Sequence, residues 1–266
     1  MGYVKNNISP WALITGASSG IGRELAYLFA KDNINLVLSA RNEKALNELA
    51  EELRRDFGIE VHVQAGDLSK LVEVERILTY LRENKLSIGY LVNNAGFGDY
   101  TRFDESDWNR QLDMIQLNIT ALTYLSRMLI GDMKSRESGM ILNIASTAAY
   151  LPGPYMAVYF ATKAYVLHFS EAIQQELLGT GVSVTTICPG PTESKFVDAA
   201  KASDSNLFKN RKMPSSKSVA SYAFEKMMKR KGVKIHGWGN FIMANATRFI
   251  PRNFTAKIAE AIMRKR

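Results

Sequence analysis

Residues 11–22 read WALITGASSGIG, an apolar run that leads directly into a glycine-rich turn. The run at 11–15 has the length and composition of a buried strand, and the residues after the turn have helical periodicity. A glycine-rich turn between a strand and a helix is the setting of a dinucleotide-binding loop. Gly16 would permit the tight turn, Gly20 would let the backbone approach a pyrophosphate, and Gly22 would allow the helix to pack closely. We expect a phosphate site here, with a glycine turn that binds nothing as the alternative.

The same alternation of short apolar runs and longer amphipathic segments continues to residue 188. Further strands are expected at 35–40, 61–65, 90–92, 140–145 and 182–188, and helices at 43–57, 69–84, 107–134 and 155–178. Strands that alternate with helices of this length predict βαβ units and a parallel sheet covered on both faces. The expected fold class is α/β: a single doubly wound Rossmann-type domain over residues 1–266, with about seven strands and a C-terminal helical tail.

The composition is that of a globular protein with a large core, since 46% of the 266 residues are hydrophobic and 23% are charged. No apolar run reaches the length of a membrane span, and Cys188 is the only cysteine, so we expect a cytoplasmic protein without an internal disulfide. The net charge of +8 comes from dispersed basic residues without a nucleic-acid motif, so nucleic acid is not an expected partner. The three histidines and the cysteine form no metal-ligand pattern, and no metal site is expected.

A tyrosine and a lysine four residues apart, Tyr159 and Lys163, lie within the helix expected at 155–178. Residues at this spacing share one face of a helix. A nearby ammonium favours the phenolate and would lower the pKa of the tyrosine, which would suit proton transfer at a carbon–oxygen centre. The alternative for this pair, taken alone, is a half-buried aromatic ring beside a solvated lysine.

Four motifs follow one another along the chain: TGASSGIG at 15–22, NNAG at 93–96, Ser146 before Tyr159-x-x-x-Lys163, and Pro189-Gly190 after the strand at 182–188. In this order and spacing they resemble the classical short-chain dehydrogenase/reductase family, and the resemblance covers residues 10–195. Residues 141–146 and 155–169 are most similar to the branch that includes 3-oxoacyl and 17β-hydroxysteroid reductases.

The resemblance implies a role for each of four residues. Tyr159 would be the general acid in carbonyl reduction and the base in alcohol oxidation, while Lys163 would lower the pKa of Tyr159 and bind the nicotinamide ribose. Ser146 would hydrogen-bond the substrate oxygen, and Asn118 would hold a water molecule that links the lysine to solvent. Asn118 has a second interpretation, as a helix N-cap or a buried structural amide.

The resemblance also implies a set of cofactor contacts around the glycine turn, the NNAG motif and the segment after residue 188. These residues are Gly16, Ser18, Ser19, Gly20, Ile21, Gly22, Asp67, Leu68, Asn94, Ala95, Gly96, Tyr159, Lys163, Pro189, Gly190 and Thr192. A turn-forming aspartate is the alternative for Asp67.

The stretch Leu38-Ser39-Ala40-Arg41-Asn42 closes the second strand and predicts which nicotinamide cofactor is bound. A site for NAD generally has an acid here for the ribose 2′-hydroxyl, but this chain has the neutral Ala40. Arg41 suits a 2′-phosphate, because its guanidinium stays charged and can bond two oxygens at once. Ser39 and Ser18 would add hydroxyl contacts. We therefore predict NADP(H), with Arg41 as a mere cap of the following turn as the alternative.

These features predict an NADP(H)-dependent oxidoreductase that moves a hydride between the nicotinamide and a carbonyl or secondary alcohol. The alternative is a catalytically weak nucleotide-sensing module on the same fold. Residues 190–216 include Phe196, Leu207, Phe208 and Met213 and are expected to form a lid over an apolar pocket. The expected small-molecule substrate is a hydrophobic ketone or a 3-oxoacyl compound.

The tail at 237–266 goes beyond the resemblance and is expected to form two helices broken at Pro251. Its apolar face comprises Phe241, Ile242, Phe249, Ile250, Phe254, Ile258 and Ile262. We expect this face to pack on the body of the protein or on a partner subunit, and contact with a membrane surface is the less favoured alternative. The resemblance implies a homodimer formed by the helices at 107–134 and 155–178.

Overall fold

The computed structural model describes residues 9–193, 196, 200 and 213–264. These residues form a parallel sheet in the spatial order β3-β2-β1-β4-β5-β6-β7. Its strands are β1 (Trp11–Thr15), β2 (Asn35–Ala40), β3 (Val61–Ala65), β4 (Ile88–Asn93), β5 (Gly139–Ile144), β6 (Val182–Cys188) and β7 (Val233–Ile235). The prediction of an α/β doubly wound sheet is confirmed.

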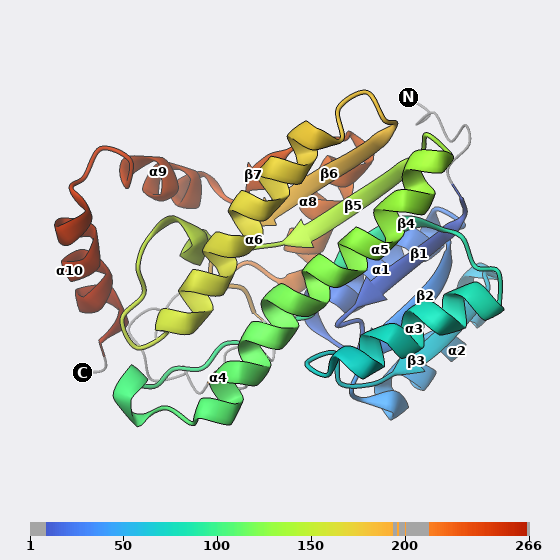
Figure 1. Cartoon of the computed structure of the whole chain (residues 1–266), viewed down its shortest axis with the longest axis horizontal. Coiled ribbons are helices and arrows are strands. Elements are labelled where there is room, and N and C mark those ends of the chain that lie inside the picture. Colours follow the sequence, from blue (N-terminus) through green and yellow to red (C-terminus); the bar gives the residue numbers. More distant parts are fainter. Residues whose placement is uncertain (1–8, 194–195, 197–199, 201–212, 265–266) are drawn as a thin grey trace.

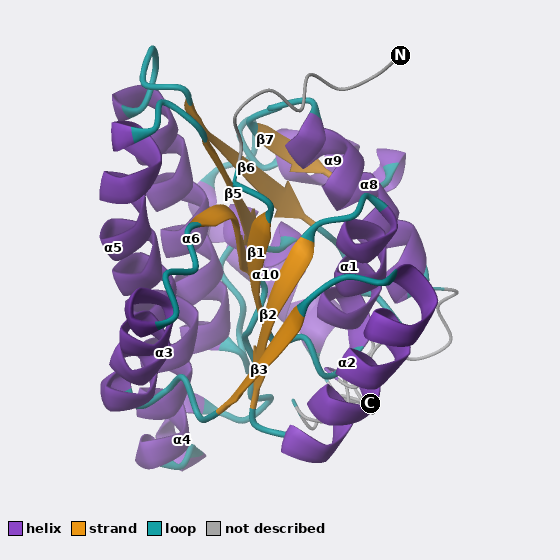
Figure 2. Ribbon diagram, turned by 90° about the vertical axis from the view of Figure 1, so that its right-hand side faces the viewer, coloured by secondary structure: helices purple, strands orange, loops and turns teal. Residues whose placement is uncertain are grey.

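Helices cover both faces of the sheet, as Figure 2 shows edge-on. One layer contains α1 (Gly20–Lys31), α2 (Glu43–Phe57) and α8 (Ser216–Met228). The other contains α3 (Leu71–Glu83), α4 (Trp108–Ile115), α5 (Leu122–Ser135) and α6 (Ala157–Glu176). Burial on both faces explains why the strands read as nearly continuous apolar runs rather than as alternating ones.

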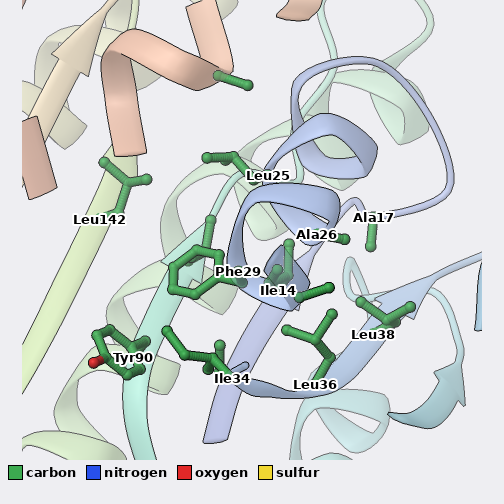
Figure 3. Packing of buried hydrophobic residues seen from close by; sticks show 14 of the residues in the cluster. Ile14, Ala17, Leu25, Ala26, Phe29, Ile34, Leu36, Leu38, Tyr90 and Leu142 are labelled. Carbon is green, nitrogen blue, oxygen red and sulfur yellow. The ribbon is translucent and has the colours of Figure 1, made fainter. Parts of the chain in front are cut away.

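The central strand β1 divides its side chains between two hydrophobic clusters. Ala12 and Ile14 pack with α1 and α2, whereas Leu13 points to the opposite face and packs with α3 and α5. Phe29 of α1 fills the first cluster, with its ring edge-on to Tyr90 at a centroid distance of 5.4 Å (Figure 3). These contacts hold α1, and with it the glycine turn, against the sheet.

The order of the strands reverses at β1, because the chain runs outward to β2 and β3 and then returns to place β4 on the other side of β1. Connections on the two sides therefore leave in opposite directions and open a crevice at the carboxyl ends of β1 and β4. The glycine turn lies at this point, and Gly16 and Gly20 have φ values of +67° and +58°. Such left-handed backbone favours glycine.

Most expected elements are confirmed, with one difference of geometry and one segment outside the described residues. The helix expected at 107–134 is α4 and α5 joined by a π-helical segment, η2 (Gln116–Ala121). Each π turn holds an extra residue, which changes the direction of the side chains that follow. The lid expected at 190–216 lies mainly outside the described residues, including its Leu207 and Phe208.

The tail forms two helices on either side of Pro251, as predicted: α9 (Trp238–Ala246) and α10 (Arg252–Met263). Figure 1 shows both at the end of the molecule toward which β5 and β6 point. Among the helices that the structure describes, none combines the length and the apolar character needed to cross a membrane.

We predict opposite effects of alanine at two helical glycines. A Cβ at Gly22 would clash with the Gly16 carbonyl oxygen and approach the Asn94 amide nitrogen to 2.5 Å, whereas one at Gly131 of α5 meets nothing within 4 Å. Gly22→Ala should lower the free energy of unfolding by about 1–3 kcal/mol through overpacking. Gly131→Ala should raise it by up to about 1 kcal/mol, because alanine favours the helix. Urea denaturation measures both, and equal stabilisation by the two alanines would contradict the packing described here.

Candidate active site

A cavity of about 650 Å³ opens where the strand order reverses. It is lined by segments at the carboxyl ends of six strands: residues 16 and 18–21 at β1, 40–42 at β2, 66–68 at β3, 94–97 at β4, 144–148 at β5 and 189–192 at β6. The volume is in the range of ligand pockets. Arg41 and every cofactor contact that the resemblance implies line this cavity, except Gly22, which lies behind the turn and packs against Gly16 and Asn94.

The turn after β1 is clamped to the NNAG segment by hydrogen bonds. The Asn94 side-chain amide donates to the carbonyl oxygens of Thr15 (2.9 Å) and Gly16 (3.2 Å). In return, the Thr15 hydroxyl oxygen accepts from the backbone N–H groups of Asn94 and Ala95, both at 3.0 Å. Asn93 is fully buried and bonds Ser126 and Asn143. The two central strands are thus tied together at the mouth of the crevice.

Tyr159 and Lys163 lie one turn apart on α6, and both side chains are buried. Ser146 follows β5, and its hydroxyl accepts from the Ala148 N–H at 3.1 Å and donates to the Pro189 carbonyl at 3.4 Å. The same hydroxyl lies near enough to the Tyr159 phenol to affect its pKa. The Lys163 ammonium donates to the Ile144 carbonyl at 2.8 Å and lies 5.9 Å from the centroid of the Tyr159 ring. The three residues expected to act together therefore meet at one wall of the cavity.

Burial dominates the acid–base properties of this group. It raises the pKa of Tyr159 to about 12, and the Ser146 hydrogen bond opposes that rise only in part. Burial also lowers the pKa of Lys163 to about 8. The expectation that Lys163 would lower the pKa of Tyr159 is not met, because the ammonium is held by the Ile144 carbonyl and the phenol is desolvated. The phenol consequently carries its proton at neutral pH.

Asn118 is a buried amide within the π-helical segment and does not line the cavity. Its side chain accepts from the Phe97 N–H at 3.2 Å and donates to the Phe97 carbonyl at 3.0 Å and to Thr162 at 3.1 Å. A Cβ at Gly96 would lie 2.9 Å from the Asn118 oxygen and 3.5 Å from the Lys163 nitrogen. Asn118 is therefore next to Lys163, and its contacts match the interpretation as a structural amide rather than as a helix N-cap.

The segment after β2 has Arg41 exposed at the edge of the cavity. The cap of α2 is Asn42, whose side chain accepts from the Ala45 N–H at 3.0 Å, so the helix does not depend on Arg41 for its cap. Ser39 is fully buried and does not line the cavity, so the prediction of a Ser39 contact with the cofactor is wrong. Asp67 accepts from the Ser69 N–H at 3.1 Å, which confirms the turn, and it also lines the cavity, where its contact with the cofactor stays a prediction.

The tail contributes to the cavity, which the sequence did not indicate. Met243 of α9 and Ala259, Ile262 and Met263 of α10 line it. The Tyr100 hydroxyl donates to the Met263 carbonyl, which ties α10 to the segment after β4. The buried residues Thr255, Ala259 and Met263 recur at every fourth position of α10, but this spacing in the sequence does not indicate what they contact.

Phe196 covers the same site from the segment after β6. Its ring centroid lies 5.2 Å from that of Tyr159, and it lines the cavity together with Met156 and Phe160. The inner part of the cavity, around the Tyr159 phenol, is therefore apolar.

Comparison with known proteins matches residues 10–205 to the family described as short chain dehydrogenase. The chain is 32% identical over 201 residues to a very-long-chain 3-oxoacyl-CoA reductase from Anas platyrhynchos, covering 74% of this chain and 64% of that protein. It is 33% identical over 187 residues to a 17-beta-hydroxysteroid dehydrogenase type 3 from Mus musculus, and this match covers 69% of this chain and 60% of that protein. The chain thus spans less than two thirds of the length of these relatives. A relative from Pongo abelii is named an inactive hydroxysteroid dehydrogenase-like protein. It is 33% identical to this chain, and the match covers 67% of this chain and 54% of that protein.

Among solved structures, a short-chain dehydrogenase from Sphingobium yanoikuyae in complex with NADPH is 31% identical, with a TM-score of 0.81 and coverage of 90% of this chain and 94% of that one. A short-chain dehydrogenase/reductase from Burkholderia phymatum in complex with NAD is 25% identical, with a TM-score of 0.80 and coverage of 97% and 96%. Structures of this fold thus occur with either nicotinamide cofactor.

We predict that Lys163→Met is at least as stable as the wild type at pH 7. The pKa of Lys163 falls from 10.5 to about 8 on folding, so below pH 8 the folded protein holds an ammonium that burial disfavours. Removing that ammonium should raise the free energy of unfolding by about 1–3 kcal/mol at pH 7, since one pKa unit corresponds to about 1.4 kcal/mol.

The lowered pKa of Lys163 also predicts how the stability of the wild type changes with pH. As pH rises from about 8 toward 10.5, Lys163 loses its proton in the folded state before it does so in the unfolded state. The wild type therefore gains stability in this window and approaches the variant. Denaturation at pH 7 and at pH 9.5 measures this, and a variant that is clearly less stable than the wild type at pH 7 would contradict the burial cost.

Proposed function

Because the chain belongs to the short-chain dehydrogenase family, whose members oxidise CH–OH groups or reduce C=O groups, we propose that it is an NADP(H)-dependent reductase of hydrophobic ketones or 3-oxoacyl compounds. The observation that carries the proposal is the buried, protonated Tyr159 phenol, which lines the same largely apolar cavity as Ser146.

The glycine turn fits the pyrophosphate of a dinucleotide. Within the described residues no side chain caps the N-terminus of α1, so its first N–H groups are available where Ser19, Gly20 and Ile21 line the cavity. The positive end of the helix dipole points the same way. Gly16 and Gly20, with left-handed φ values, form the turn that leads into this helix. With the cofactor bound in this cavity, its nicotinamide would supply the hydride.

The chain's own residues would manage the proton. Ser146 would hydrogen-bond the carbonyl oxygen of the substrate and hold it next to the Tyr159 phenol. Tyr159 would donate its proton to that oxygen as the alkoxide charge develops. Because the phenol keeps its proton at neutral pH, the site suits carbonyl reduction. Lys163, fixed on the Ile144 carbonyl, would bind the ribose of the cofactor.

The preference for apolar substrates is supported by the cavity wall around Tyr159. The body of the protein lines this wall with Phe97, Leu151, Met156, Phe160 and Phe196. The tail adds Met243 and Ile262. Burying apolar area contributes about 25 cal/mol per Å², so a long or bulky apolar ketone gains more here than a small polar one. The names of the relatives, a 3-oxoacyl-CoA reductase and a hydroxysteroid dehydrogenase, agree with this class.

The second candidate function is a nucleotide-sensing module with little catalysis, and the relative named inactive favours keeping it. A module of this kind has no need of a proton donor. This chain has both Tyr159 and Lys163, and they meet Ser146 at the cavity wall. The intact acid–base group favours the enzyme.

Tyr159→Phe should lower kcat for carbonyl reduction with NADPH at least about 100-fold, because it removes the proton donor. Cofactor binding, measured by nicotinamide fluorescence, should persist. Tyr165→Phe is the matched control: Tyr165 is on the same helix, but its hydroxyl contacts Thr123 at 3.1 Å, away from the cavity. That control should retain full activity. Near-wild-type turnover by Tyr159→Phe would exclude the proposed proton donor.

Arg41→Ala should remove most of the preference for NADPH over NADH. A charge-assisted bond to the 2′-phosphate contributes about 1.5–3 kcal/mol, so we expect a wild-type preference of at least about tenfold in kcat/KM and little change in NADH activity in the variant. Arg55→Ala is the control, since Arg55 is an exposed arginine of α2 that pairs with Asp56 outside the cavity. Equal use of NADPH and NADH by the wild type would refute the role of Arg41.

A further inference from the structure

The tail exposes an unusual share of apolar surface. Of the sixteen large hydrophobic side chains that are exposed in the described part of the chain, eight lie within residues 238–263. They are Trp238, Phe241, Ile242, Met243, Phe249, Phe254, Ile258 and Ile262. Phe249, between the two helices, is 87% exposed, and Trp238 is 76% exposed. Concentrated apolar surface of this kind marks an interaction site rather than ordinary surface variation.

The exposure follows from how α10 packs. Thr255, Ala259 and Met263 recur at every fourth position and are buried against the body of the protein. Phe254, Ile258 and Ile262 recur at the same interval, one residue earlier, and stay exposed. The expected packing on the body is thus not found for Phe254 and Ile258 and is incomplete for Ile262, while the expected packing on a partner subunit stays a prediction. The helix is held by its small and medium residues and presents a second apolar stripe outward.

The charge of the tail indicates what kind of partner covers the exposed stripe of Phe254, Ile258 and Ile262. Residues 237–266 contain six basic residues and one acidic residue, Glu260. Arg248 and Lys257, between and beside the exposed apolar residues, are themselves exposed. Two tails with this charge would repel each other across a symmetric contact. An anionic lipid surface, in contrast, attracts basic residues and accepts apolar side chains at the same time.

The exposed apolar surface is continuous with the cavity. Met243 and Ile262 belong to the exposed set and also line the cavity that contains Tyr159. Figure 1 shows α9 and α10 together at the end of the molecule that the carboxyl ends of β5 and β6 face. A lipid-like molecule that reached the tail could pass from one apolar environment to the other along these side chains.

We propose that α9 and α10 dock on an anionic lipid bilayer and hold the mouth of the cavity at its surface, so that an apolar carbonyl substrate enters from the lipid. The route of the substrate rests on the proposed reductase function, whereas the docking itself does not. Phe249, Phe254 and Ile258 enter the acyl boundary, and the basic residues of the tail contact the headgroups. The amphipathic tail lies on the membrane and does not cross it.

Sedimentation of the full chain with vesicles tests the docking. We expect binding to phosphatidylcholine mixed with phosphatidylserine, and at least about tenfold weaker binding to phosphatidylcholine alone, because each basic residue near an anionic surface contributes about fivefold. The variant Phe249→Ser/Phe254→Ser/Ile258→Ser should lose at least about tenfold in binding. Its turnover of a water-soluble ketone should match the wild type, since these three residues lie outside the cavity.

The matched control is Val72→Ser/Trp108→Ser/Leu178→Ser, which removes three apolar side chains of comparable exposure elsewhere on the surface. It should bind vesicles like the wild type. If the tail triple variant fails to fold, Phe249→Ser alone provides the comparison, with an expected loss of about threefold or more.

Several outcomes would overturn the proposal. These are absence of binding to the anionic vesicles, equal binding by the tail variant and the wild type, and light scattering that shows the tail variant converting a dimer to a monomer while vesicle binding is absent. The last result would mean that a second copy of the chain covers the stripe. Vesicle binding without turnover of any ketone would instead contradict the reductase proposal and leave the docking standing.

Discussion

The hydrogen bonds between Asn94 and the turn after β1 are the constraint on which the site depends. They tie β1 to β4 at the place where the order of the strands reverses, through the Thr15 hydroxyl on one side and the Gly16 carbonyl on the other. A crevice between diverging connections would otherwise be free to close or widen. With the two strands clamped, the glycine turn, the NNAG segment and the ends of β5 and β6 face one cavity at fixed positions.

Burial at the wall of that cavity sets the acid–base properties of Tyr159 and Lys163. Tyr159 and Lys163 are buried, and burial favours the neutral form of each side chain. It therefore raises the pKa of the Tyr159 phenol and lowers the pKa of the Lys163 ammonium. The phenol thereby keeps a proton to donate, and the lysine remains titratable near physiological pH. The same apolar wall that produces these shifts extends through Phe196 and Ile262 to the exposed face of the tail. The apolar wall thus links the proposed acid, the proposed substrate class and the proposed route of entry.

The fold and much of the site could be predicted from the sequence because their signals are local. Strands such as Trp11–Thr15 and Asn35–Ala40 are short, largely apolar runs, and the glycine turn has its own spacing. The π-helical segment could not be predicted, because it reflects long-range hydrogen bonds from Asn118 to Phe97 and Thr162. The sign of the Tyr159 pKa shift was missed for a similar reason, since burial by distant elements outweighs the lysine one turn away. The wall supplied by α10 likewise depends on the contact between Tyr100 and Met263.

Burial keeps the Tyr159 phenol protonated, as the proposed role of proton donor in carbonyl reduction requires. The most direct measurement is an ultraviolet titration of tyrosinate absorbance in the wild type and in Tyr159→Phe, whose difference isolates this one phenol. With the pKa of Tyr159 at about 12, the difference curve should show no tyrosinate from this residue at neutral pH, and its titration should begin only well above the ordinary value of 10.0. A tyrosinate signal at neutral pH that disappears in the variant would contradict the account.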